Sequence, residues 1–518
     1  MTSSPPPTPP RVEDTQPIPP SPPKAPRPRW RLFAAVGVVV VLVAVGLWWA
    51  LSPKGAPSSS QAPVAIPSGV GPAPAGTGKT LDVAADGSKQ YRTIADAAAQ
   101  AQPGDTILIQ PGSYAGFTVP RSGTDGEWIT YQAAPGGQVL IDSDDASDKG
   151  RVDLSGRSFI KLAGIVVQDA NHFGIYAEKT SNIVLDHVEV ADSRHGGVVF
   201  LTGTNITVQY SNVHGNNSIG TDAEMEAISM DNVQGFEIVG CTVTGNGEEG
   251  IDAKYESSNG RIHGNTATGN RGPNIYIDSA HDIVVSDNKV SGATGPGKSG
   301  IMLGVEDYSD SRRIANITVE NNVATGNTGG GIAFFTESNG TFQNISIINN
   351  TLAGNQTAGL VVGDTQLSGT NVLRNNVFGD NAGRDIKGST DDFTVDHNLF
   401  SAPGPGSDNV VGAPVFVDEA GGNLALAPDS PGIGAGSPEG HPPRTSTASR
   451  DRATNRTSAP TRRLRAEARD TSPCGIGDVR PRMAVVAPDR TRRSSVDAGD
   501  RCVAGYVVVA RRGGHRRT

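Results

Sequence analysis

The sequence reads Gly250-Ile-Asp-Ala-Lys254, and a segment of the same kind, Asn274-Ile-Tyr-Ile-Asp278, follows it along the chain. Both segments have glycine or a substitute, then apolar, variable, apolar and variable residues. Eight copies start at Gly174, Gly197, Ala227, Gly250, Asn274, Gly300, Gly331 and Gly359. Repeats with a period in this range are typical of solenoids. Because the strand is constant while the connectors vary in length, the pattern predicts an all-β parallel β-helix whose strands stack at about 4.8 Å.

A second strand in each coil ends in asparagine, as in Asn316-Ile-Thr-Val-Glu-Asn-Asn322. Alignment of the coils gives two columns: Asn265, Asn288, Asn322, Asn350 and Asn376, then Asn246, Asn270, Asn327, Asn355 and Asn381. Asparagine tolerates left-handed backbone geometry at turns, and its amide can bond to the amide one coil above. The columns therefore predict structural asparagine ladders. Cys241 falls in the first column, which gives it a structural role as well.

The N-terminal region differs in composition from the coils. Residues 1–31 are rich in proline and carry basic residues just before the uncharged apolar run 32–51. An apolar run of this length can span a bilayer, and basic residues on the N-terminal side keep that end in the cytoplasm. We therefore expect a cytoplasmic tail, a transmembrane helix and, in residues 52–78, a flexible linker rich in Pro, Ser, Ala and Gly. A cleaved signal peptide is the alternative for the apolar run. Either arrangement exports the β-helix domain, which we place at residues 79–440.

The C-terminal segment, residues 441–518, is a basic tail without the coil pattern. It contains 18 Arg against 7 Asp plus Glu, which is a net charge of +11. Because the net charge of the whole chain is -9, residues 1–440 carry about -20. The tail is predicted to be disordered, and a reading-frame shift is one explanation of its composition. Two of the three cysteines lie in this tail, which does not indicate a disulfide framework.

The first part of the domain carries a resemblance to a known group of proteins. Leu81-Asp-Val-Ala-Ala-Asp-Gly87 and the segment from Thr93 to Tyr114, with Pro103-Gly-Asp-Thr-Ile-Leu-Ile-Gln-Pro-Gly112, resemble the opening of right-handed parallel β-helix proteins of the pectate-lyase-like superfamily. With the coils, the resemblance covers about residues 80–436. It implies that a helix at 94–101, capped by Thr93, covers the open end of the first coil. Within the superfamily the opening looks most like polysaccharide lyases of the bacterial pectate lyase and alginate lyase groups, although the fold alone does not determine activity.

The variable positions of the eight strands form two outward columns, because side chains alternate between the two faces of a strand. Polar residues gather on three consecutive coils, which supply Ser229, Asp231, Asp252, Lys254, Tyr276 and Asp278. The coils on either side offer apolar residues instead. Connectors beside this patch add Glu224, Glu226, Glu248, Glu249 and Glu256. A purely solvated surface would scatter its charges among the coils, so the patch is the candidate site.

The patch has the groups that β-elimination at a uronate needs, namely a positive charge on the carboxylate and a base for the C5 proton. We predict Ca²⁺ held by Asp231, Asp252, Asp278 and Glu249, because calcium prefers several carboxylate oxygens. Lys254, between Asp231 and Asp278 in its column, is the predicted base, with Tyr276 as a second catalytic residue. Without a metal the aspartates would keep Lys254 protonated. The predicted substrate-binding residues are Ser229, Glu226, Tyr308 and Phe335.

The same residues are compatible with other functions. Asp231 and Asp278 lie two coils apart, roughly 9 to 10 Å, which is compatible with an inverting glycosidase, although the ordered motifs of β-helix polygalacturonases are absent. A C5-epimerase would need a further proton donor, such as Tyr276 or His263. Alternatively, the charges form only a cross-strand ladder on a non-catalytic module that binds glycan or cell wall.

The remaining expectations concern histidines and partners. His172, His187, His195 and His263 lack metal-ligand spacing, which predicts turn or surface roles. The expected partner is an acidic polysaccharide or cell-wall glycan, with membrane attachment through the N-terminal helix. We expect no nucleic-acid partner and a monomeric protein.

Overall fold

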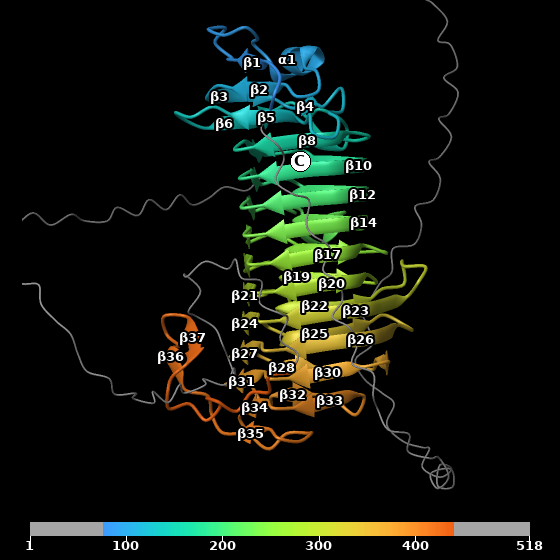
Figure 1. Ribbon diagram of the computed structural model, residues 1–518, viewed down its shortest axis with the longest axis vertical. Helices are drawn as coiled ribbons and strands as arrows, with labels where there is room; N and C mark the ends of the chain where they lie inside the picture. The colour runs from blue at the N-terminus through green and yellow to red at the C-terminus, as the bar shows by residue number, and fades with distance from the viewer. Residues whose placement is uncertain (1–75, 440–518) are drawn as a thin grey trace, which may run out of the picture.

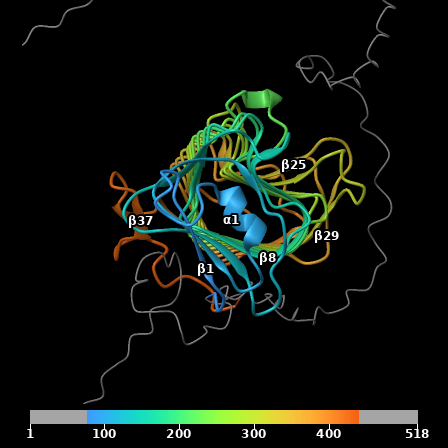
Figure 2. The ribbon, with the colours of Figure 1, turned by 90° about the horizontal axis from the view of Figure 1, so that it is seen from above.

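The chain folds as a right-handed parallel β-solenoid of about 12 turns, stacked from the N-terminal end in blue to the C-terminal end in orange (Figure 1). The computed structural model describes residues 76–439. Strand segments of successive coils pair to form three ladders, called here the first, second and third. Viewed along the stack, the ladders surround a common interior (Figure 2), which buried apolar side chains fill. The predictions for residues 1–31, 32–51 and 441–518, and for most of the linker 52–78, lie outside the described residues.

The first and second ladders together make the 22-stranded sheet. The first ladder contains β4 (Phe117–Thr118), β7 (Gly150–Asp153), β16 (Ile251–Lys254), β19 (Ile275–Asp278), β22 (Ile301–Val305), β25 (Gly330–Thr336), β28 (Ala358–Val361) and β32 (Ile386–Lys387). The second contains β1 (Thr80–Val83), β2 (Thr106–Ile109), β5 (Ile129–Ala133), β8 (Ser158–Ala163), β17 (Ser258–His263), β20 (His281–Ser286), β23 (Arg313–Glu320), β26 (Thr341–Ile348), β29 (Gln366–Ser368), β30 (Asn371–Arg374) and β33 (Phe393–Asp396). Three long strands run through both ladders: β10 (Phe173–Asp186), β12 (Val198–Gln209) and β14 (Ile228–Val239).

The third ladder is the 13-stranded sheet, which is also parallel. Its strands are β3 (Gly112–Ala115), β6 (Val139–Ser143), β9 (Val166–Gln168), β11 (Glu189–Ala191), β13 (Asn212–His214), β15 (Thr242–Thr244), β18 (Thr266–Thr268), β21 (Lys289–Ser291), β24 (Val323–Thr325), β27 (Thr351–Ala353), β31 (Val377–Gly379), β34 (Leu399–Phe400) and β35 (Val410–Val411). A 3-10 turn, η1 (Gly220–Asp222), lies in the connector before β14.

The predicted register of the eight coils is confirmed. Parallel pairing aligns Tyr176 with Val199, Val199 with Ser229, Ser229 with Asp252, and Asp252 with Tyr276, and continues to Met302, Ala333 and Val361. The intervening apolar residues, such as Ile251 and Ile277, are fully buried in one core that runs along the interior. Burying each large aliphatic side chain contributes about 1.5–3 kcal/mol. The variable positions therefore face away from this core.

Both asparagine ladders are present, and one detail of their prediction is wrong. Asn265 Nδ2 donates to Asn288 Oδ1 at 3.0 Å, and the chain of amides continues through Asn398. In the second ladder, Asn274 bridges Asn270 to Asn327. The left-handed residue of each turn is the one before the ladder asparagine, such as Asn321 with φ of 55°. That residue makes the turn, which leaves the ladder side chain free to point inward and bond between coils.

Replacing Asn322 by alanine is expected to lower the free energy of unfolding by about 1–3 kcal/mol, because buried donors and acceptors would lose their partners. Asn322 Nδ2 donates to the Val285 carbonyl at 2.9 Å and to Asn350 Oδ1 at 3.0 Å, and Asn322 Oδ1 accepts from Asn288. Urea denaturation measures the loss, with exposed Asn171→Ala as the control. Equal stabilities of the two variants would contradict the structural role of the ladder.

The two ends of the described solenoid are built differently. At the N-terminal end α1 (Ile94–Gln100) lies over the interior when the stack is viewed from above (Figure 2). The Thr93 side chain accepts from the Asp96 amide at 3.1 Å, which confirms Thr93 as the N-cap. At the C-terminal end β36 (Phe416–Asp418) and β37 (Asn423–Leu426) form an antiparallel hairpin.

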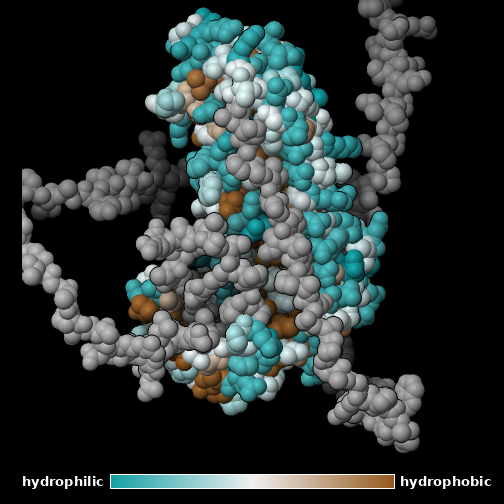
Figure 3. Space-filling view, viewed as in Figure 1, coloured by the Kyte–Doolittle hydropathy of each residue, from teal (hydrophilic) through white to brown (hydrophobic). Residues whose placement is uncertain are grey.

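The described surface is mostly hydrophilic on the face seen in Figure 3, with apolar side chains near the C-terminal end. Four residues of that end, Val411, Val415, Val417 and Ile433, are each at least 41% exposed. Within residues 76–439 there is no helix of the length and hydropathy that a membrane span requires. The predicted span at 32–51 lies outside this range and stays a prediction.

Candidate functional site

The candidate site lies on the outward face of the first ladder, on β14, β16 and β19. Pairing places Asp231 beside Lys254 and Lys254 beside Asp278. Their neighbours along the strands, Met230, Ala253 and Ile277, belong to the interior core. The polar residues thus project outward from three adjoining coils, as predicted. Most of them are nevertheless well shielded, with Asp252, Lys254 and Asp278 no more than 6% exposed.

The ammonium group of Lys254 contacts carboxylates other than the two predicted beside it. Its Nζ lies 2.7 Å from Glu226 Oε1 and 3.8 Å from Asp252 Oδ2. Asp231 and Asp278 are its neighbours in the column, yet neither is within ion-pair distance. The predicted position of Lys254 is therefore confirmed and its expected partners are wrong, because the long side chain reaches the connector carboxylate of Glu226. The ammonium also lies 5.3 Å from the centre of the Tyr255 ring.

Ser229 holds the Glu226 carboxylate in place. Ser229 Oγ donates to Glu226 Oε2 at 2.6 Å and accepts from the Glu226 amide at 3.0 Å. Both side chains are predicted substrate-binding residues, and in this structure they bond to each other. The outcome is a continuous chain of contacts from Ser229 through Glu226 to Lys254.

Opposing effects determine the charge states in this cluster. Burial alone would lower the pKa of Lys254, but the charges of Glu226 and Asp252 outweigh it and raise that pKa well above its usual value. Burial, followed by repulsion from Glu226, raises the pKa of Asp252 well above the usual range. Asp252 Oδ1 is buried and has no hydrogen-bond partner. Lys254 therefore carries a proton at neutral pH, and Asp252 has an oxygen available for a ligand or a proton.

Asp278 forms a second group with Tyr276 and Glu306. Asp278 Oδ1 accepts from Ser279 Oγ at 2.8 Å and from the Glu306 amide at 3.2 Å. The Tyr276 hydroxyl donates to Glu306 Oε1 at 3.0 Å. Burial and the nearby charge of Glu306 raise the pKa of Asp278 to about 8. Sequence reasoning did not assign Glu306 to the site. Glu306 lies in the connector after β22, and strand register does not determine the path by which a connector brings its side chains to the site.

The other predicted metal ligands lie at the border of these two groups. Burial raises the pKa of Glu249, whose carboxylate is 3.6 Å from Lys298 Nζ. Burial also raises the pKa of Asp231 and, with repulsion from Glu249, raises that of Glu248 to about 7. Burial raises the pKa of Glu306 as well. Six carboxylates of this face thus have raised pKa values for the same reason, which is the removal of charge from water.

Apolar side chains flank the charged patch on both sides along the stack. Toward the N-terminal end Phe173, Tyr176 and Val199 form one outward cluster, and toward the C-terminal end Tyr276, Met302 and Ala333 form another. Of the predicted sugar-contacting aromatics, Phe335 is 39% exposed and aligns with Gly304 beside the second cluster. Tyr308 is 66% exposed, two residues after Glu306. Both are accessible, and their role in binding stays a prediction.

Gly304 makes room for the Tyr276 ring. A Cβ at Gly304 would lie 2.2 Å from the Tyr276 hydroxyl oxygen and 2.5 Å from its Cε2. Gly304→Ala is therefore expected to displace Tyr276 from Glu306 and to cost about 1–3 kcal/mol of stability. Gly363→Ala is the matched control in the same column, because its nearest contact is 3.4 Å. Thermal denaturation of both variants checks this, and an unchanged midpoint for Gly304→Ala would contradict the packing described.

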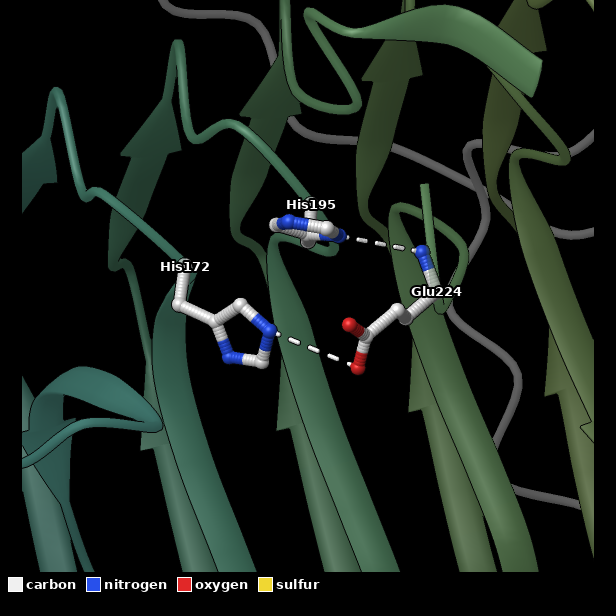
Figure 4. A group of neighbouring side chains, drawn as sticks. All are labelled: His172, His195 and Glu224. Carbon is white, nitrogen blue, oxygen red and sulfur yellow. Dashed lines mark hydrogen bonds and ion pairs between the residues drawn. The ribbon is translucent and has the colours of Figure 1, made fainter. Parts of the chain in front are cut away.

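A compact group of potential metal ligands lies outside the predicted set. Among residues 76–439, one group of three His, Cys, Asp or Glu side chains has its donor atoms within 4.8 Å of one another, and it consists of His172, His195 and Glu224 (Figure 4). His172 and His195 lie in connectors, as predicted, and the connectors of three successive coils bring them together with Glu224 although their spacing in the sequence is not that of metal ligands. Asp231, Asp252, Asp278 and Glu249 do not form such a group.

Comparison with known proteins agrees with the fold. Residues 77–377 match the family model described as the Pel9A-like right-handed β-helix region. The crystal structure of pectate lyase Pel9A has a TM-score of 0.51 at 18% identity, with 74% of this chain and 97% of that chain covered. The uncharacterized protein YwoF of Bacillus subtilis (strain 168) is 25% identical, with 69% of this chain and 92% of the relative covered. The A-module of the mannuronan C-5 epimerase AlgE6 of Azotobacter vinelandii has a TM-score of 0.44 at 15% identity, with 60% and 94% covered.

Proposed function

Because this chain belongs to the Pel9A-like right-handed β-helix family, we propose that it acts on an acidic polysaccharide and cleaves it by β-elimination beside a uronate carboxylate. The observation that supports this most directly is the position of Lys254. Its ammonium lies on the outward face among Glu226, Asp252 and the carboxylates of the adjoining coils. A base and the residues that control its proton are thus gathered in one place, flanked by apolar clusters that suit a sugar ring.

The chemistry of β-elimination assigns roles to these groups. A base removes the proton at C5, the electron pair forms a double bond to C4, the C4–O bond breaks, and the leaving oxygen takes a proton from water. Lys254 is the base in this proposal, and Glu226 positions its Nζ through the 2.7 Å contact. Lys254 can accept the C5 proton only after it has lost its own. Neutralisation of the Asp252 charge by a bound cation would lower the pKa of Lys254, because that charge is one of those that raise it.

Calcium is part of the proposal, and the donor chemistry on this face fits it. The candidate ligands Asp231, Asp252, Asp278 and Glu249 offer carboxylate oxygens, which calcium prefers, and Asp252 Oδ1 is buried without a partner. Because these residues form no group of three donors within 4.8 Å, two of them together with substrate oxygens would have to complete the coordination. Bound Ca²⁺ would supply the positive charge that neutralises the uronate carboxylate and makes the C5 proton more acidic.

Two other functions are favoured by particular observations. Asp278, with a pKa of about 8, could serve as the general acid of an inverting glycosidase. The protonated, ion-paired state of Lys254 suits a module that binds uronate carboxylates without cleaving the chain. Elimination creates an unsaturated uronate that absorbs ultraviolet light, hydrolysis creates reducing ends without this absorbance, and binding creates neither.

The proposal is tested by incubating the full chain with pectate, alginate or glucuronan, with calcium or with a chelator. We expect ultraviolet-absorbing products from one polymer, a complete loss of product after chelation, and a loss of about 10²–10⁴-fold in rate for Lys254→Ala. Lys161→Ala is the matched control, because Lys161 also pairs with an aspartate but lies on the second ladder. Reducing ends without absorbance would identify a hydrolase, and calcium-dependent retention on the polymer without any product would identify a binding module.

A further inference from the structure

The cluster of His172, His195 and Glu224 lies at the edge of the first ladder, in the connectors that precede β10, β12 and β14. His172 Nε2 is 3.4 Å from Glu224 Oε2. The centres of the two imidazole rings are 4.4 Å apart, and the rings are tilted by 56° (Figure 4). Three potential ligands therefore converge on one point, although each comes from the connector of a different coil.

Hydrogen bonds prepare this group for a metal ion. His172 Nδ1 lies 3.1 Å from the Lys149 carbonyl, which can only accept, so Nδ1 carries the proton and Nε2 presents its lone pair to Glu224. A backbone carbonyl in this role is the usual outer partner of a metal-binding imidazole. His195 Nδ1 accepts from the Glu224 amide at 3.2 Å, so its lone pair also points toward the Glu224 residue.

The spacing suits a small tetrahedral ion. Two ligands at about 2.1 Å from a zinc ion lie about 3.4 Å apart in tetrahedral geometry, which equals the 3.4 Å between His172 Nε2 and Glu224 Oε2. A metal ion bound to His195 Nδ1 would displace the hydrogen bond from the Glu224 amide. Because Glu224 is exposed, its amide can then donate to water instead. The side chain of His172 is 17% exposed and that of Glu224 is 57% exposed, so solvent can reach the site and a fourth ligand can enter.

We propose that His172, His195 and Glu224 bind one divalent transition-metal ion of the zinc type, with a coordination position left open to water or to a carboxylate of the glycan. Two imidazoles and one carboxylate favour zinc and its neighbours over calcium, which takes only oxygen ligands. This site is separate from the proposed calcium ligands. It is nevertheless close in the chain to the lyase centre, because Glu226 follows Glu224 by two residues. The proposal does not require the chain to be a lyase.

Calorimetric titration of the full chain with Zn²⁺ alone tests the proposal. We expect one Zn²⁺ per chain whose affinity falls at least tenfold in His172→Ala, His195→Ala and Glu224→Gln. The matched control is His187→Ala, because the His187 side chain is 68% exposed and pairs with Asp186 on the second ladder. Equal affinities in the wild type and the two histidine variants, or displacement of Zn²⁺ by an equimolar amount of Ca²⁺, would overturn the assignment.

A second measurement uses the unmodified chain, so it does not depend on the folding of the variants. Diethyl pyrocarbonate labels accessible imidazoles, and mass spectrometry locates the label. We expect Zn²⁺ to protect His172 and His195 while His187 is labelled as before. Protection of His441 or His515 in place of the pair would show that the ion binds elsewhere in the chain, and the proposal would then be wrong.

Discussion

Replacement of Lys254 by methionine is expected to lower the free energy of unfolding by about 3–5 kcal/mol, because it leaves the carboxylates of Glu226 and Asp252 buried without a cation. Both carboxylates are within 4.0 Å of Lys254 Nζ, and both residues are at most 9% exposed. The loss should be larger at pH 8 than at pH 5, since the isolated carboxyl groups can take up protons in acid. Urea denaturation at the two pH values measures it.

A second substitution separates the charge effect from the loss of packing. In Lys254→Met with Glu226→Gln, one of the stranded charges is gone, so we expect about half of the lost stability to return. Lys161→Met is the matched control, because its pair with Asp186 is partly exposed and is worth at most about 1 kcal/mol. A double variant no more stable than Lys254→Met would refute the ion cluster as the cause. If rescue occurs, the double variant also provides a folded protein for the activity assay, without the proposed base.

The coils were predictable because a strand in a stacked solenoid has one constant requirement. Inward positions such as Ile251 and Ile277 must be apolar, and a slip of one residue would place Asp252 or Lys254 in the core. The register therefore followed from hydrophobicity alone, and with it the outward columns of the candidate site. The asparagine columns were predictable for a similar reason, since a buried amide needs a partner on the next coil.

The partners of these outward residues were less predictable, because they lie on connectors. Lys254 has a long side chain, and its contact with Glu226 depends on the path of the connector before β14. The same holds for Glu306, which reaches Tyr276 from the connector after β22. Strand register determines the Cα positions of neighbouring coils, but it leaves open which carboxylate a flexible ammonium contacts.

The histidine cluster had a signal in the sequence, namely the positions of its residues relative to the strands that follow them. His172 and His195 each precede the first glycine of their coil by two residues, and Glu224 precedes Ala227 by three. Counting backward from the strands would have placed the two imidazoles one above the other, at about the 4.8 Å spacing between coils. Glu224 lies in the longer connector that contains η1 and does not share the two-residue spacing of the histidines. Its position next to them therefore could not be obtained by counting back from the strand.

The stability of the domain is expected to fall as the pH rises from about 5 to 8 in calcium-free buffer. Asp278 has a pKa raised from 3.8 to about 8 by burial and by the charge of Glu306. Between these pH values the folded state retains a proton that the unfolded state has lost. The contribution of Asp278 to stability is therefore complete below about pH 4 and is lost as the pH passes about 8. Each pKa unit corresponds to about 1.4 kcal/mol, which gives up to about 6 kcal/mol for this group.

Other carboxyl groups determine the pH at which the domain is most stable. Burial raises the pKa of Glu248 and of Glu320 to about 7, and both act in the same direction as Asp278. Hydrogen bonds from Lys161 and from Arg374 lower the pKa values of Asp186 and Asp396 against the effect of burial, so their contribution is lost in acid. Stability should therefore be greatest near pH 5, between these two ranges.

Urea denaturation between pH 4 and pH 9 checks this dependence, and Asp278→Asn identifies the contribution of Asp278. Asparagine carries no charge at any pH, so the variant should lose less stability between pH 5 and pH 8 than the wild type, while exposed Asp125→Asn should follow the wild type. Wild-type stability that rises toward pH 8 would mean that these carboxylates are already ionised in the folded chain. Repulsion among the ionised carboxylates of this face would then have to be offset by a bound cation. Added calcium should therefore increase the free energy of unfolding more at pH 8 than at pH 5.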